Sequence, residues 1–321
     1  MGEPMDPFFD SSHRARTRAF HLLLPLLGAF GEVSMTEVIR HSPELTELRI
    51  PYSSNKDQFN FLLASDIHLD NPKCDRKLFA KHLNEMQERK GKALFFGDVM
   101  CLMQGKKDRR GSKGDIRPEH LGGNYFDLVF NETANWLKPW QEDIVMMSDG
   151  NHETAIINHN EVDPLGNVVR IMRDSGSPVE HMRYQGFVWF TFYQKGLERA
   201  QEKIRRLTLG FHHGTWGGVI TKGTLGGGRY ASIMPDADVI VNGHNHERTI
   251  VAHPCYRINN KGEQRIEQRW HIQTGTYKQE FKGGGGFAIE KIVMPKSLGG
   301  IWLKLRPRAS SGVEITCEPA T

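Results

Sequence analysis

The stretch Phe59-Asn60-Phe61-Leu62-Leu63-Ala64-Ser65 runs directly into Asp66-Ile67-His68 and sets a pattern that recurs along the chain. A short apolar run rich in strand-forming residues, stopping at polar ones, predicts a buried β-strand. Asp66 and His68 are two residues apart, so in a continuing strand their side chains would point the same way. Just past the strand end, both side chains can converge on one ion.

Four further apolar runs end in clusters of the same kind. The runs 93–96, 143–147, 207–211 and 237–241 lead to Gly97-Asp98, Gly150-Asn151-His152-Glu153, His212-His213-Gly214 and Gly243-His244-Asn245-His246. Apolar periodicity predicts helices over 77–89, 125–137 and 168–173, and further strands over 186–193, 265–274, 287–293 and 301–305. Strands that alternate with helices predict an α/β sheet with its site along the carboxyl edge. We expect the late strand-rich stretch to complete a second sheet packed on the first.

The composition is that of an ordinary globular protein. The chain has 321 residues, 38% hydrophobic and 25% charged, which suits one large α/β domain or two small ones. Its 42 basic and 38 acidic residues give a net charge of +4, a slight preference for anionic partners that does not establish nucleic-acid binding. The four cysteines are scattered, so a reducing compartment fits best. No apolar run reaches the roughly 18 residues of a membrane span.

The first 34 residues are interpreted as an N-terminal extension, and residues 35–321 as a single domain. Three arginines (Arg14, Arg16 and Arg18) precede an apolar run over 19–30, as in a secretory signal peptide. Acidic residues before the run, interruptions within it and a weak cleavage site argue against secretion. We therefore expect a cytoplasmic protein. The extension is then a short amphipathic helix or an upstream addition before an original start at Met35, with secretion as the open alternative.

The five clusters carry ligands for hard or borderline divalent metals, and no cysteine belongs to them. The Asp98 carboxylate has two oxygens and can bridge two ions. Asn151 offers an amide oxygen, and the histidines offer imidazole nitrogens, a mixture that suits manganese, iron or zinc better than calcium. Two ions about 3.5–4 Å apart clamp a phosphoryl group and lower the pKa of a bridging water. His152, beside a ligand, is the natural general acid for the leaving oxygen, and we expect Gly150 to allow a sharp turn there.

The motif order Asp-x-His, Gly-Asp, Gly-Asn-His-Glu, His-Gly and Gly-His-x-His, over about residues 60–277, resembles the calcineurin-like metallophosphoesterase superfamily. The resemblance implies a two-sheet αβ sandwich, with a C-terminal β segment over 278–307, and a dinuclear metal centre. It implies two divalent ions, with manganese favoured and iron, zinc or magnesium as alternatives. The first ion would be held by Asp66, His68, Asp98 and His246, and the second by Asp98, Asn151, His213 and His244. His152 would be the acid, and His213 is preferred to His212 because the family's ligand immediately precedes the glycine.

The chain departs from the family's patterns at two places. Cys101 stands where the family often has an acidic residue, three positions after the bridging aspartate, so the support around the metal site is expected to differ. The extended motifs Gly-Asp-x-His-Gly and Gly-Asp-x-Val-Asp-Arg-Gly of the protein Ser/Thr phosphatases are absent. The resemblance is therefore closer to the nuclease and phosphodiesterase members.

A phosphodiesterase or nuclease acting on DNA, RNA or a nucleotide is the leading hypothesis. It relies on the Gly-His-x-His ending, shared with DNA repair nucleases of the family, and on the basic segment 106–113 within a predicted loop over 101–124, which is otherwise a plain solvated loop. In the glycine-rich stretch 214–230, Lys222 and Arg229 are candidate substrate-binding residues, whereas Gly283–Gly286 suggests a hairpin turn. The alternatives are a small-metabolite phosphomonoesterase and a catalytically silent scaffold. The sequence leaves the oligomeric state open.

Overall fold

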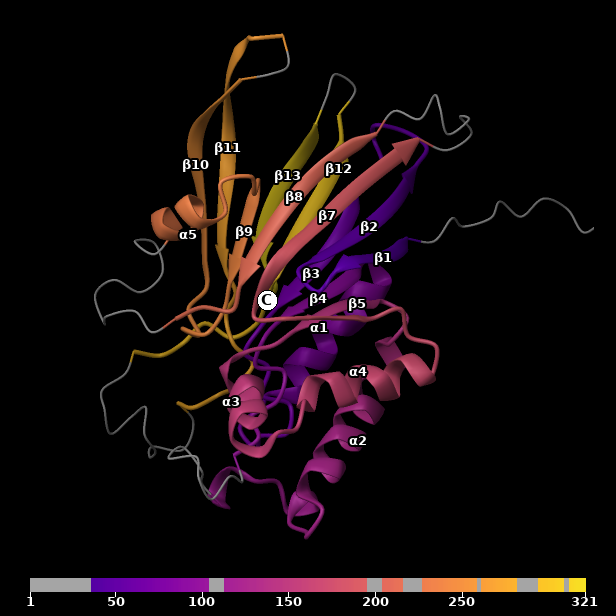
Figure 1. The fold of residues 1–321 in the computed structure, drawn as a ribbon, viewed down its shortest axis with the longest axis vertical. Coiled ribbons are helices and arrows are strands. Elements are labelled where there is room, and N and C mark those ends of the chain that lie inside the picture. Colours follow the sequence, from indigo (N-terminus) through magenta and orange to yellow (C-terminus); the bar gives the residue numbers. More distant parts are fainter. Residues whose placement is uncertain are drawn as a thin grey trace, which may run out of the picture. The chain divides into compact units, whose positions relative to one another are not determined.

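All five clusters follow strands that belong to two stacked sheets of the computed structural model (Figure 1). The structure describes residues 36–103, 113–194, 204–215, 227–258, 261–281, 294–308 and 312–321. Several predictions fall outside these residues: the extension 1–34, the basic segment 106–112, Lys222, the turn Gly283–Gly286 and the strand 287–293. All described residues belong to one compact unit, Met35–Thr321.

The first sheet has six strands in the order β13-β12-β3-β4-β5-β6. Strands β3 to β6 pair in parallel, whereas β12 is antiparallel to both β3 and β13. Their bounds are β3 Phe59–Ala64, β4 Lys92–Phe96, β5 Ile144–Ser148, β6 Glu180–Met182, β12 Ile301–Pro307 and β13 Val313–Pro319. Helices connect the parallel strands: α1 Arg76–Glu88, α2 Tyr125–Leu137, α3 Asn151–Asn160 and α4 Pro164–Asp174, with 3₁₀ turns at Lys113–Asp115, Pro118–His120 and Lys138–Trp140.

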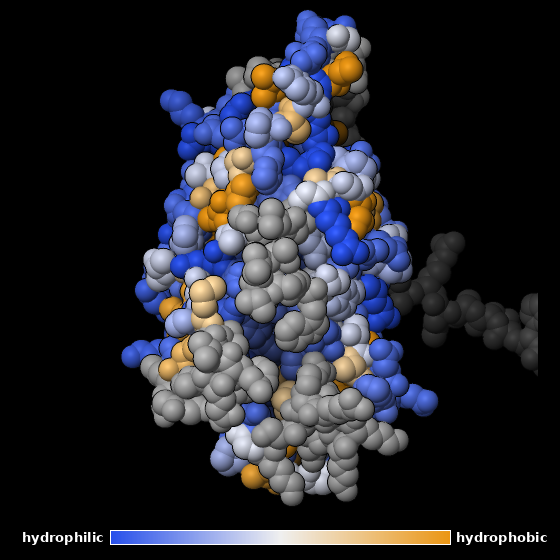
Figure 2. All heavy atoms as spheres, turned by 90° about the vertical axis from the view of Figure 1, so that its left-hand side faces the viewer, coloured by the Kyte–Doolittle hydropathy of each residue, from blue (hydrophilic) through white to orange (hydrophobic). Residues whose placement is uncertain are grey.

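The second sheet has seven strands in the order β1-β2-β7-β8-β9-β11-β10. Its strands are β1 Glu37–Ser42, β2 Leu45–Tyr52, β7 Gln185–Gln194, β8 Arg205–His212, β9 Val239–Asn242, β10 Thr249–Ile258 and β11 Gln264–Gln273. The short helix α5, Gly227–Ile233, precedes β9, and its neighbours Met234 and Ala237 pack on Ile240. The β10–β11 hairpin exposes Tyr256, Ile258 and Ile266, and Figure 2 shows apolar groups at that end of a largely hydrophilic face.

Burial on both faces explains why the predicted strands are continuous apolar runs in the sequence. In β3, Phe61 and Leu63 pack against the second sheet, whereas Leu62 packs against the helices. In β4, Phe96 likewise packs against the second sheet and Phe95 against the helices. A strand that is buried on both faces has no polar face, so its pattern is an unbroken apolar run. The predicted two-sheet αβ sandwich is therefore confirmed.

The expectation that the late strand-rich stretch completes a second sheet holds for β10 and β11 but not for β12. β10 and β11 join the seven-stranded sheet, where β11 pairs in parallel with β9. β12 joins β3 in the six-stranded sheet because both its faces are apolar: Trp302 packs in the helix-side core and Leu303 between the sheets.

Candidate metal centre

The candidate site lies where the carboxyl ends of β3, β4 and β5 meet those of β8 and β9. Backbone hydrogen bonds join the loops that leave these strands. The amide of Asp66 donates to the carbonyl of Gly97 at 3.1 Å, and that of His68 donates to the carbonyl of Asp98 at 3.0 Å. Within the second sheet, the amide of Gly243 donates to the carbonyl of His213 at 2.7 Å, and between the sheets the amide of His244 donates to Asp66 Oδ2 at 2.9 Å. The fold thus holds the loops of both sheets in a fixed register at one edge.

Asp66, His68 and His246 form the first donor group, with one ligand atom from each lying within 4.8 Å of the others. Asp66 Oδ1 lies 3.3 Å from His246 Nε2. Within the described residues, Asp66 Oδ1 and both ring nitrogens of His68 are buried without a hydrogen-bond partner. Buried polar atoms left in this way are costly. A metal ion would satisfy them, so these residues fit the metal that the sequence implies.

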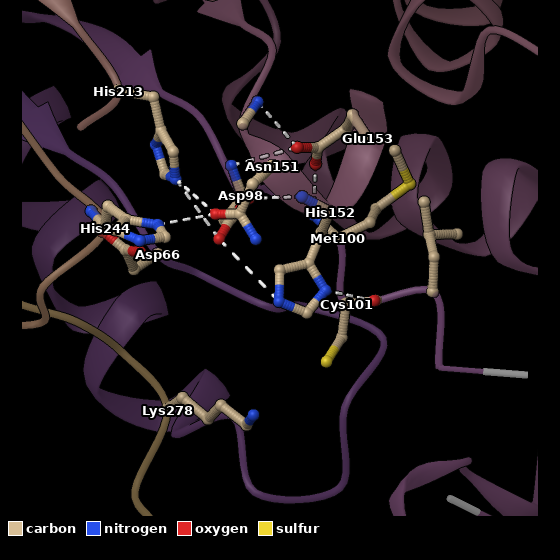
Figure 3. Close-up of polar contacts among 12 residues, drawn as sticks. Asp66, Asp98, Met100, Cys101, Asn151, His152, Glu153, His213, His244 and Lys278 are labelled. Carbon is tan, nitrogen blue, oxygen red and sulfur yellow. Dashed lines mark hydrogen bonds and ion pairs between the residues drawn. The ribbon is translucent and has the colours of Figure 1, made fainter. Parts of the chain in front are cut away.

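Asp98, His213 and His244 form the second donor group, again with ligand atoms within 4.8 Å of one another. His213 Nε2 lies 3.3 Å from Asp98 Oδ2 and 3.1 Å from the amide oxygen of Asn151. That oxygen also lies 2.7 Å from His244 Nδ1. Figure 3 shows these side chains pointing toward a common centre. The structure therefore brings the seven predicted ligands together at one edge of the sheets, with Asp98 in the second donor group; its role as a ligand of both ions stays a prediction.

The choice between two adjacent histidines has a structural counterpart. His213 is fully buried, and its Nδ1 donates to the carbonyl of Phe96 at 2.8 Å, which leaves Nε2 facing the other donors. A hydrogen bond of this kind is how proteins fix the ring of a metal-binding histidine. His212 lies at the end of β8 and its Nδ1 accepts from the amide of Gly214 at 3.0 Å. His212 belongs to no donor group in the described part of the chain.

The electrostatics favour ionised carboxylates surrounded by imidazoles. Burial alone would raise the pKa of Asp98, but His213 and His152 outweigh it and hold that pKa well below its usual range. Burial would likewise lower the pKa of His213, but the Asp98 charge raises it to about 10. For Asp66, His246 overcomes the effect of burial and lowers the pKa of the carboxyl. The two carboxylates, Asp66 and Asp98, thus stay negatively charged where a cation would bind.

His152 faces the donor groups from the start of α3. Its Nδ1 lies 2.6 Å from the carbonyl oxygen of Cys101, which can only accept, so Nδ1 carries the hydrogen. Its other ring nitrogen, Nε2, lies on the side of Asp98, 3.9 Å from Oδ2. The ring packs edge-on against His68, with 4.8 Å between centroids. His152 lies outside both ligand groups that the resemblance implies, but one of its ring nitrogens lies within 4.8 Å of ligand atoms of His68 and Cys101, so its role as the acid stays a prediction.

Two buried carboxylates that the sequence did not single out hold the site loops in place. Glu153 accepts from the amides of Asp98 and Met100 at 3.1 and 3.0 Å, and from Gly150 at 2.9 Å. Asp70 accepts from the amide of Cys101 and, at 2.9 Å, from that of Leu102. Glu153 could have been found from its place in the Gly-Asn-His-Glu cluster. For Asp70 the sequence gives no such signal.

The candidate ligands occupy an uncommon backbone conformation. Eight described residues other than glycine have positive φ, and five are Asp66, His68, Asp98, His244 and His246, with φ from 50° to 71°. Such residues cost of the order of 1–3 kcal/mol each and gather at functional sites. Here the left-handed turns follow directly after strands and bring each ligand back toward the centre.

Gly150 is needed for a reason other than the sharp turn that the sequence predicted. Its φ of −112° is available to any residue, so the chain needs no special turn there. Instead, a Cβ at Gly150 would lie 2.1 Å from Asp98 Oδ1 and 2.3 Å from the Asp98 amide nitrogen. Glycine is required because the two loops touch at this point.

Arg229, the candidate substrate residue that the structure describes, lies outside the donor groups. Arg229 is exposed on α5, and its charge adds to burial and His213 in lowering the pKa of His212. The sequence also missed Lys278, whose side chain is 11% exposed and pairs with Glu280 at 2.9 Å. After burial, Lys278 is the largest influence that lowers the pKa of His68. A cation therefore lies beside the first donor group, where an anionic substrate would be attracted.

No model of a known protein family matches the chain, and no curated protein matches it. Among solved structures, it is similar to Vps29 from Chaetomium thermophilum, with 12% identity and a TM-score of 0.35, over 81% of this chain and 96% of that one. It is similar to Zn²⁺-bound Vps29 from Entamoeba histolytica, with 12% identity and a TM-score of 0.35, over 82% and 99%. A predicted phosphoesterase from Streptococcus pneumoniae has 10% identity and a TM-score of 0.31, over 82% and 91%. The site is therefore assigned from the chain's own residues. Of the helices in the described ranges, none has the length and apolarity to cross a membrane.

Proposed function

We propose that this protein is a two-metal-dependent phosphoester hydrolase, and that its substrates are phosphodiesters in nucleic acids or nucleotides. The observation that supports it best is the pair of neighbouring donor groups, in the first of which Asp66 Oδ1 and the ring nitrogens of His68 have no hydrogen-bond partner among the described residues. When bound, two divalent ions, manganese by preference, supply an activated water and neutralise charge on the phosphoryl oxygens. The choice of a diester comes from the Gly-His-x-His ending and the basic segment of the sequence.

The protein's own side chains contribute a general acid in a fixed position and charged groups beside it. In its imidazolium form, with a hydrogen on each ring nitrogen, His152 would donate the Nε2 proton to the leaving oxygen, while Nδ1–H stays bonded to the Cys101 carbonyl and fixes the ring plane. Asp98 Oδ1 accepts from the His152 amide at 2.9 Å, so the acid and the shared carboxylate are held together. Lys278, largely buried beside His68, would stabilise negative charge on the substrate.

A substrate panel tests this function. Purified protein with manganese would be offered bis-(p-nitrophenyl) phosphate, p-nitrophenyl phosphate, single- and double-stranded DNA, RNA and cyclic nucleotides. We expect turnover of the diester and of at least one nucleic acid or nucleotide. Turnover of the monoester alone would replace the diester assignment with a phosphomonoesterase. Absence of turnover with two metals bound would favour a silent scaffold.

Adjacent histidines provide a matched control. His213→Asn removes a buried nitrogen that faces Asp98 and Asn151, and we expect it to abolish turnover and weaken metal binding. His212→Asn changes the same residue type one position earlier, outside the donor groups, and should leave both properties close to wild type. Equal losses in the two variants would contradict the assignment of the site.

A further inference from the structure

Cys101 lies beside the first donor group although no cysteine belongs to the metal-binding motifs. Its sulfur, one ring nitrogen of His68 and one of His152 lie within 4.8 Å of one another. Both Cys101 and His68 are 1% exposed, and neither ring nitrogen of His68 has a hydrogen-bond partner among the described residues. The thiol therefore shares a buried corner with an imidazole whose hydrogen-bonding capacity is unused.

We propose that the Cys101 sulfur is a further ligand of the ion held by His68, which gives the first site a stronger preference for zinc and cobalt than the second site has. The proposal rests on the metal centre of the proposed function but not on hydrolysis. Thiolate is a soft ligand that favours zinc and cobalt, whereas carboxylate, carbonyl and water favour manganese and magnesium. Among the described residues, no donor group joins a cysteine to Asp98, His213 or His244, the ligands of the second group. The two sites would thus differ in metal preference.

The fold holds the sulfur in position on three sides. The Cys101 amide donates to Asp70, and the Cys101 carbonyl accepts from His152 Nδ1 at 2.6 Å, so its backbone is fixed. The side-chain amide of Asn71 donates to the sulfur at 3.2 Å. Burial raises the pKa of the Cys101 thiol, and this hydrogen bond acts against that rise by stabilising the thiolate. Figure 3 shows the sulfur on the same side as the Lys278 side chain, whose positive charge would compensate a bound thiolate.

Ligation exchanges one bond for another. The S–H bond of Cys101 breaks, a sulfur–metal bond of about 2.3 Å for zinc forms, and the proton passes to the buffer. No oxidant or reductant is needed. His68 and Asp66 would also bind the ion, through a ring nitrogen of His68 and Asp66 Oδ1. These atoms have no hydrogen-bond partner in the described structure.

Cobalt spectroscopy tests the proposal directly. The metal-free full-length protein is titrated anaerobically with Co²⁺, and a thiolate-to-cobalt charge-transfer band is sought in the near ultraviolet. We expect the band in wild type and its loss in Cys101→Ser. Cys74→Ser is the matched control because Cys74 is also buried but belongs to no donor group of the described residues, so this variant should keep the band.

X-ray absorption of the zinc-loaded wild type gives a second readout that needs no variant. A sulfur neighbour at about 2.3 Å is expected. In Cys101→Ser, zinc affinity should fall by at least the roughly 10- to 100-fold that loss of an outer partner costs, with a smaller change for manganese. Cobalt bound with neither the band nor a sulfur neighbour would overturn the proposal and leave the hydrolase intact. Failure to bind any metal would overturn both.

Discussion

Gly150→Ala places a single methyl group against the centre of the site. The added Cβ would lie 2.1 Å from Asp98 Oδ1, 2.3 Å from the Asp98 amide nitrogen and 2.8 Å from Asp98 Cγ. Because two of these atoms belong to a buried carboxylate and one to the backbone, no flexible side-chain end can move aside. To reach the 3.4 Å of ordinary contact, Asp98 Oδ1 would have to retreat by about 1.3 Å.

A displacement of this size is large for a catalytic site. Misplacing a reacting group by about 1 Å can cost on the order of 100-fold in rate, so we expect turnover to fall at least that far. Overpacking of a core typically destabilises by about 1–3 kcal/mol, so the protein should still fold, with Tm lower by a few degrees. Both metals should bind more weakly, since the proposed centre makes Asp98 a ligand of both ions.

The assay combines turnover of bis-(p-nitrophenyl) phosphate, metal content and thermal unfolding. Gly123→Ala is the control, because a Cβ at Gly123 would meet no atom within 4 Å. It should match wild type in all three measurements. Wild-type turnover and metal content in Gly150→Ala would refute the idea that the contact between these loops positions Asp98.

Four further predictions concern the site. Asp98→Asn should abolish turnover and weaken binding of both metals, as measured by metal content after dialysis; loss of only one metal would contradict a shared ligand. His152→Ala should slow turnover by about 10²–10⁴-fold with both metals retained, and loss of a metal would make His152 a ligand instead. Because Asp98 raises the pKa of His213 to about 10, the metal-free site holds a proton that the metal must displace. Calorimetry should therefore show metal affinity at the second site falling about tenfold per unit as pH decreases below that value, whereas affinity independent of pH would contradict it. Arg229→Ala should raise KM for the true substrate, and unchanged KM and turnover would remove its substrate role.

The sequence predicts the parts of the fold that are buried on both faces. The runs before Asp66 and Asp98 are continuous because the helices cover one face and the second sheet covers the other. Helix α2 matches its predicted range, 125–137, because its apolar residues repeat at helical spacing. The ligand positions follow from the same rule, since each cluster comes directly after such a strand.

Elements with weak or one-sided patterns could not be predicted in this way. β1 (EVIRHS) has no fully buried residue, and β10 contains Pro254, which a strand tolerates at an edge. In α3 only Glu153 and Ile156 are buried, so its sequence has no apolar face that would predict a helix. Each of these elements is defined by pairing with a neighbour rather than by its own periodicity.

The sequence also could not predict which site residues, far apart along the chain, come together in the fold. Lys278 comes close to His68 because the chain after β11 passes under the Asp66 loop, where the Tyr277 amide donates to the Asp66 carbonyl at 3.1 Å. Asp70 and Cys101 meet through a hydrogen bond that no local pattern encodes. Cys101 was recognised as a departure in sequence, but its closeness to two imidazoles is a property of the fold.

The most direct test of the metal centre is anomalous diffraction from crystals of the protein soaked in manganese. Two peaks should lie about 3.5–4 Å apart, one bound by Asp66, His68 and His246, the other by Asn151, His213 and His244, with Asp98 touching both. A single peak, or peaks away from these residues, would contradict the two-metal centre from which the proposed function follows.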